Sequence, residues 1–195
     1  MAAPYEIVAA PLTVYVAAVG TAFPDVDETP SGSWTKLGTS GDKNYGDDGV
    51  TVGHPQSIET FTPAGGTVPR KAFRTEEGLT FGLTLVDFSP EQVAKIMDDA
   101  AITTTAASSG IPGTKKVALY KGLQVDTFAL LARGLSSVNE SLAAQFEVDS
   151  CFQGGEPEPT FNKGVPVGYE LEYVALDASG DGDPYRLTIQ TAAAS

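Results

Sequence analysis

The sequence holds very few of the residues that usually carry chemistry. Cys151 is its single cysteine and His54 its single histidine. One cysteine cannot form an internal disulfide, so we expect Cys151 to be a small, half-buried strand residue and see no sign of an oxidising compartment. A catalytic serine or cysteine would have to use His54, but no nucleophile motif lies near it. We expect a surface or packing histidine, with a His54-dependent hydrolase as the alternative.

Aromatic platforms and long apolar runs are also missing. Trp34 is the only tryptophan, and one such ring makes a poor platform for a sugar or base, so we expect it to pack in the core or an interface. No run approaches the ~20 apolar residues of a membrane span. Residues 1–6 lack the positive and apolar regions of a secretory signal. We therefore expect folding in the cytoplasm, with no membrane partner.

Positive charge is scarce. The chain has 12 Lys and Arg against 25 Asp and Glu, a formal net charge of -13. Such a surface repels nucleic acid and anionic lipid. Two interpretations stay open: the charge serves solubility alone, or it lines a wall along which DNA slides without binding.

The residues that are abundant favour a β protein. The 195-residue chain is 42% hydrophobic and 19% charged, which is typical of a globular protein. Its 21 Gly and 13 Pro separate segments that are rich in Thr and Val, as turns separate strands. We predict a single domain over residues 1–195. Since a domain averages ~150 residues, a chain of this length could also form two. The expected fold is mainly β, a barrel or sandwich with one packed α-helix and long loops.

The predicted helix spans about residues 90–100. Ser89 would cap it, Pro90 would take its first position, and Gln92 would complete a capping box. Predicted strands cover residues 12–19, 33–37, 79–85, 116–120, 123–132, 142–152, 168–176 and 185–191, with residues 50–61 extended. We expect a flexible arm over about 38–73, a mobile loop over about 101–115 and a frayed tail over 192–195.

No metal or cofactor site is expected. The segment from Asp177 to Asp183 alternates short acidic residues like a calcium loop, but Thr188 stands where such a loop needs its bidentate Glu. An acidic hairpin turn is the favoured interpretation. The glycines of residues 110–116 lack the spacing of a phosphate-binding loop.

Acidic side chains recur on one face of two predicted strands. Glu147 and Asp149 share a face of one strand, and Glu170 and Glu172 share a face of another. These carboxylates would form either an ordinary solvated sheet face or the acidic wall of a channel.

Three of the twelve basic residues lie within five positions, at Arg70, Lys71 and Arg74. In so acidic a protein they could pair with the carboxylates of a neighbouring subunit. The alternative is a local pairing with Glu76 and Glu77, which would contribute little to stability.

The chain resembles the major tail proteins, or tail tube proteins, of long-tailed, non-contractile bacteriophages. The segments that carry the resemblance are APLTVYV at 10–16, VGTAFP at 19–24, WTKLG at 34–38, YGDDGVTV at 45–52, and residues 74–87. They span roughly the first half of the chain, and the second half matches only in outline.

The resemblance implies a structural virion protein with no active site or cofactor. Its subunits would close rings of six copies that stack into a tube around a tape-measure protein, with tail tip and terminator proteins at the ends. DNA would pass through without specific binding. Such a subunit would be assembled in the host cytoplasm and reside in the virion tail.

Residue roles follow from the same resemblance. The loop between 38 and 73 would contact the next ring, with Arg70, Lys71 and Arg74 in inter-ring pairs. Glu147, Asp149, Glu170 and Glu172 would supply charge to the lumen. The rival interpretations are another acidic virion protein, such as a tail terminator or capsid decoration protein, and a β-sandwich binding module.

Overall fold

The computed structural model describes residues 10–137, 141–178 and 182–193. These residues form twelve strands, one α-helix and one short 3₁₀ helix. In chain order they are β1 (Thr13–Ala18), β2 (Thr35–Lys36), η1 (Gly41–Asn44), β3 (Tyr45–Gly53), β4 (Gln56–Phe61), β5 (Lys71–Glu77), β6 (Thr80–Leu85), α1 (Pro90–Ile96), β7 (Ile102–Thr105), β8 (Thr114–Val117), β9 (Phe128–Leu135), β10 (Ala143–Gln153), β11 (Tyr169–Ala175) and β12 (Tyr185–Ile189).

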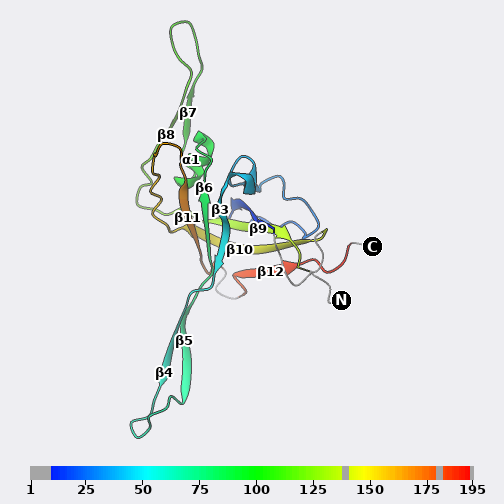
Figure 1. Ribbon diagram of the computed structural model, residues 1–195, viewed down its shortest axis with the longest axis vertical. Coiled ribbons are helices and arrows are strands. Elements are labelled where there is room, and N and C mark those ends of the chain that lie inside the picture. The colour runs from blue at the N-terminus through cyan, green and yellow to red at the C-terminus, as the bar shows by residue number, and fades with distance from the viewer. Residues whose placement is uncertain (1–9, 138–140, 179–181, 194–195) are drawn as a thin grey trace.

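Eight strands form one antiparallel sheet, which bends at β10. The strand order is β2-β1-β9-β10-β11-β6-β3, and β12 also pairs with β10. The first half of β10 pairs with β12 and its second half with β11. The pairing of β10 with β9 has a register shift between Val148 and Cys151. In Figure 1, β9, β10 and β12 run across the view, whereas β3, β6 and β11 run along the long axis. The bend therefore produces two layers whose strands cross steeply.

The core lies between these two layers. Val14 and Leu130 from one layer pack in the same buried cluster as Phe81, Leu83 and Tyr173 from the other. In the strands of this core, such as β6 and β11, buried residues alternate with residues that are partly or fully exposed. This period of two is the pattern that predicted both strands from the sequence.

The mainly β prediction is confirmed in the form of a sandwich, and a closed barrel is not found. The two ends of the described sheet, β2 and β3, do not pair with each other. Within the same residues, β3 pairs only with β6 and β12 only with β10, so the sheet keeps open edges.

The helix α1 is shorter than predicted. It ends at Ile96, and Asp98 and Asp99 then have φ angles of 55° and 50°, a left-handed conformation that cannot continue a right-handed helix. The predicted capping box is wrong: Ser89 makes no side-chain cap, and the Gln92 side chain instead accepts a hydrogen bond from the Gly38 N–H at 2.9 Å. Gln92 thus ties α1 to the loop after β2.

Two segments expected as a flexible arm and a mobile loop contain β-strands, of which only residues 50–61 were expected to be extended. Residues 38–73 contain β3, β4 and the start of β5, and residues 101–115 contain β7 and part of β8. Figure 1 shows the β4–β5 hairpin and the β7–β8 hairpin projecting from opposite ends of the molecule. Of the tail expected over 192–195, residues 194 and 195 lie outside the described part.

Candidate assembly surfaces

The β4–β5 hairpin continues the outer two strands of the sheet. Gly53 pairs with Thr80 in the sheet, and Gln56 pairs with Glu77 in the hairpin in the same register. Between them the Gly78 N–H donates to the Pro55 carbonyl at 3.0 Å. The chain therefore forms one long ribbon, whose outer part leaves the sandwich.

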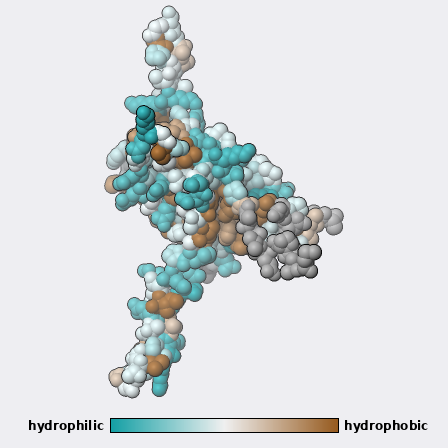
Figure 2. Space-filling model, in the orientation of Figure 1, coloured by the Kyte–Doolittle hydropathy of each residue, from teal (hydrophilic) through white to brown (hydrophobic). Residues whose placement is uncertain are grey.

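Every residue of β4 and β5 is exposed. Phe61 and Phe73 keep 56% and 47% of their surface accessible and lie on the same face of the hairpin. Figure 2 shows the resulting hydrophobic patches along an otherwise hydrophilic arm. A two-stranded hairpin without a covering layer is marginally stable in water, so this arm is a natural contact surface for a partner.

The three predicted basic residues lie on this hairpin but differ in their contacts. Arg74 pairs with Glu77 at 2.8 Å, which is the local pairing that the sequence offered as the alternative. The Lys71 ammonium instead lies 5.1 Å from the centre of the Phe73 ring. Arg70 and Lys71 have no carboxylate partner among the described residues. Arg70 is the exposed cation nearest the hairpin tip.

The β7–β8 hairpin forms a second arm beside α1. Lys115 of β8 pairs with Glu91 of the helix. The chain after this hairpin exposes a run of large apolar side chains: Leu119, Tyr120, Leu123 and Val125. This apolar loop, residues 118–127, is a further surface that no other described part of the chain covers.

The predicted acidic residues fall into two separate groups. Glu147 is buried, and its carboxylate accepts from Arg186 Nε at 2.6 Å and from Gln145 Nε2 at 2.7 Å. Asp149 contacts the same guanidinium at 3.1 Å. The Arg186 guanidinium also lies 5.0 Å from the centre of the Phe23 ring. Both carboxylates thus pair with Arg186 within the subunit, and its single positive charge offsets one of their two negative charges.

Glu170 and Glu172 instead line an open groove. They lie on the exposed face of β11, opposite Thr84 and Gly82 of β6. Thr51, from β3, completes a groove of about 460 Å³. The small Thr and Gly side chains leave this face of the sheet open, and the carboxylates give it a negative charge.

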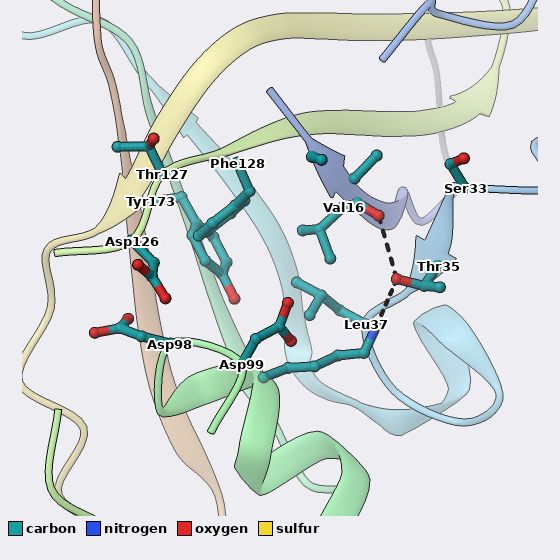
Figure 3. A pocket seen from close by; sticks show the side chains of 13 residues that line it. Val16, Ser33, Thr35, Leu37, Asp98, Asp99, Asp126, Thr127, Phe128 and Tyr173 are labelled. Atoms are coloured by element: carbon teal, nitrogen blue, oxygen red, sulfur yellow. Dashed lines mark hydrogen bonds between the residues drawn. The ribbon is translucent and has the colours of Figure 1, made fainter. Parts of the chain in front are cut away.

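A second acidic cavity lies beside α1 and was not predicted. Asp98 and Asp99 follow the helix, and Asp126 precedes β9; together with Phe128 and Tyr173 they line a cavity of about 490 Å³ (Figure 3). Five segments of the chain line it, so no local sequence motif could reveal it.

The remaining candidate residues lie in surroundings typical of surface or packing side chains. His54 is exposed, Trp34 is buried with its ring 5.1 Å from that of Phe23, and burial raises the pKa of the Cys151 thiol well above its ordinary value.

The described residues contain no group of three His, Cys, Asp or Glu side chains that could hold a metal ion. Of the proposed acidic turn, residues 179–181 lie outside the described part. No described helix is long and apolar enough to cross a membrane.

Comparison with models of known protein families and with curated proteins found no match for this chain.

Proposed function

We propose that this protein is a structural virion subunit that assembles with copies of itself into the tail tube of a long-tailed bacteriophage. Its rings, of six subunits, stack around a tape-measure protein and end at tail tip and terminator proteins. DNA later passes through the bore without specific binding. In this proposal the protein performs no catalysis, assembles in the host cytoplasm and resides in the virion tail.

The exposed β4–β5 arm is the observation that carries the proposal. Every residue of both strands is exposed, and two phenylalanines and three cations lie on or next to the hairpin. Such a ribbon has no core of its own, so burial against another chain would stabilise it. The open edges at β3 and β12 offer further backbone groups to a neighbouring subunit.

The charge distribution supports an anionic bore. Six copies at a formal charge of -13 each carry -78. Glu170 and Glu172 line an open sheet groove, and we assign the lumen charge to them. Glu147 and Asp149 are left out of this role because both carboxylates are already paired with Arg186 of the same subunit. DNA that meets such a wall is repelled rather than bound.

Reversing the charge of the arm tests the proposal. The double variant Arg70→Glu/Arg74→Glu should remain a folded monomer, since both side chains are exposed, but should lose the sedimenting assemblies that the wild type forms at high concentration. The control Lys43→Glu/Lys163→Glu changes the net charge equally at exposed sites elsewhere and should assemble normally. Undiminished assembly of the arm variant would contradict the role of the arm.

A further inference from the structure

The cavity beside α1 is a built pocket with a definite chemical character. Val16 and Leu37 form one apolar wall, Phe128 lies above it, and acidic side chains gather on the opposite side (Figure 3). Its volume of about 490 Å³ is large enough for a long side chain.

The pocket is anionic. Asp98, Asp99 and Asp126 supply three carboxylates to the lining, which also contains Lys95, and Lys121 approaches Asp98 from outside the lining. Lys121 lies 3.8 Å from Asp98, and the Lys95 ammonium donates to Thr35 Oγ1 at 2.5 Å. Asp99 and Asp126 form no ion pair within the described residues, although the charge of Asp99 acts on the nearby Lys95 ammonium. The lining therefore keeps carboxylates that are available to an incoming cation.

An unpartnered hydroxyl points into the same space. Tyr173 is only 3% exposed, and its hydroxyl has no hydrogen-bond partner among the described residues. In Figure 3 this hydroxyl points into the space bordered by Asp126 and Asp99. Burial raises the pKa of Tyr173 far above its ordinary value, so the group stays neutral. Because Tyr173 lines the open cavity, its hydroxyl is free to accept a hydrogen bond from a ligand there.

These features fit an organic cation and not a metal ion. The described carboxylates do not gather closely enough to hold a metal. The aromatic rings of Phe128 and Tyr173 border the cavity, and such rings favour a guanidinium or ammonium group. A guanidinium group can also donate to several acceptors at once, which the spread carboxylates and the Tyr173 hydroxyl oxygen provide.

The chain itself carries a matching cation on its β4–β5 arm. Residues 61–74 contain Arg70, Lys71 and Arg74 and no acidic residue. Arg70 has no carboxylate partner among the described residues. Figure 1 shows the arm leaving the body at the end away from α1, so an arm and its own pocket face opposite ways. The match is therefore between successive copies, head to tail, which is the arrangement that builds an open stack.

We propose that this pocket receives the Arg70 guanidinium group from the β4–β5 arm of a second copy of the chain. The inference rests on the self-assembly proposed above and gives the arm its receptor. Asp99 and Asp126 bind the guanidinium group, and the Tyr173 hydroxyl accepts one of its N–H groups.

A cysteine pair tests the contact directly. In the variant Arg70→Cys/Asp126→Cys, a bismaleimide cross-linker about as long as the lost arginine side chain should join assembled copies into a ladder of covalent multimers on a denaturing gel. Every copy carries both partners, and a cross-linker is needed because the two Cα atoms of an arginine–carboxylate pair lie too far apart for a direct disulfide. Arg70→Cys/Asp25→Cys is the matched control and should give no ladder, since Asp25 is exposed outside the pocket. Assemblies without a ladder, or a product that stops at dimers, would overturn the inference.

A charge exchange provides the second measurement. Arg70→Glu and Asp126→Lys should each raise the protein concentration needed for assembly about tenfold, and the double variant should largely restore it. If the wild type assembles but the double variant is no better than the single ones, the pocket is not the receptor while the tube proposal stands. If the wild type forms no assemblies at any concentration, the proposed function itself fails.

Discussion

Arg186 connects a buried acid to the surface of the sheet. Its guanidinium pairs with Glu147 and Asp149 and stacks over Phe23. The acids were visible in the sequence, but their partner was not, because the pairing of Glu147 with Arg186 depends on the register between β10 and β12. Two of the four predicted lumen carboxylates thereby acquire a structural role within the subunit.

Removing Arg186 should destabilise the fold. Arg186→Ala leaves the Glu147 carboxylate buried without its cation, and we expect a loss of about 2 kcal/mol in the free energy of unfolding, reduced by the partial exposure of the arginine. Urea unfolding followed by the fluorescence of the buried Trp34 measures it. Adding Glu147→Gln should recover part of the loss, and an unchanged midpoint for Arg186→Ala would contradict the assignment.

Asp87 joins the loop after β2 to the start of α1. Its carboxylate accepts from the Thr39 N–H at 2.7 Å, from Thr39 Oγ1 at 2.5 Å and from the Ser89 N–H at 3.0 Å. Burial alone would raise the pKa of Asp87, but these donors outweigh it and hold the pKa below the ordinary value of 3.8. The ionised form is therefore the one that the fold favours.

The stabilising effect of Asp87 should depend on pH. A lowered pKa in the folded state means that the contribution is complete above about pH 4 and is lost as the pH falls through the folded-state value. Asp87→Asn should thus lower the free energy of unfolding by about 1–2 kcal/mol at pH 7 and by progressively less below pH 4. Denaturation at both pH values, with the exposed Asp25→Asn as control, measures this difference. A pH-independent deficit would contradict it.

Strands with one buried face were predictable, and fully exposed strands were not. Phe81, Leu83 and Leu85 alternate with polar residues, so the sequence predicted β6 closely. β5 lies in the exposed arm, where no buried face imposes an alternation, and it was interpreted as a charged segment. The end of α1 was missed because Met97 continues the apolar stripe at helical spacing and Ala100 lies beside it, whereas Asp98 and Asp99 adopt left-handed backbone angles.

The exposed face of β11 allows a test of the bore. Glu170→Lys/Glu172→Lys should still assemble, but its tubes should retain short DNA duplexes at low salt and protect them from nuclease, because a basic lumen attracts the DNA backbone. Asp25→Lys/Asp27→Lys adds the same charge on exposed residues outside the groove and should give no protected DNA. Equal protection in both variants, or in neither, would contradict a lumen position for Glu170 and Glu172.

The chain as a whole exposes more surface than its mass requires. Its accessible surface is 12514 Å², whereas a compact monomer of 20.2 kDa exposes about 8,800 Å². The excess is larger than the roughly 1,600 Å² that a standard protein interface buries in total. The arms at opposite ends and the open sheet edges account for this shape, and all of them favour burial against further copies.

Negative-stain electron microscopy of the purified protein over a range of concentrations tests self-assembly most directly. We expect stacked rings at intermediate concentrations and hollow tubes at high ones, with a lumen wide enough for a DNA duplex. Separate monomers at every concentration, or closed shells and sheets without a bore, would contradict it.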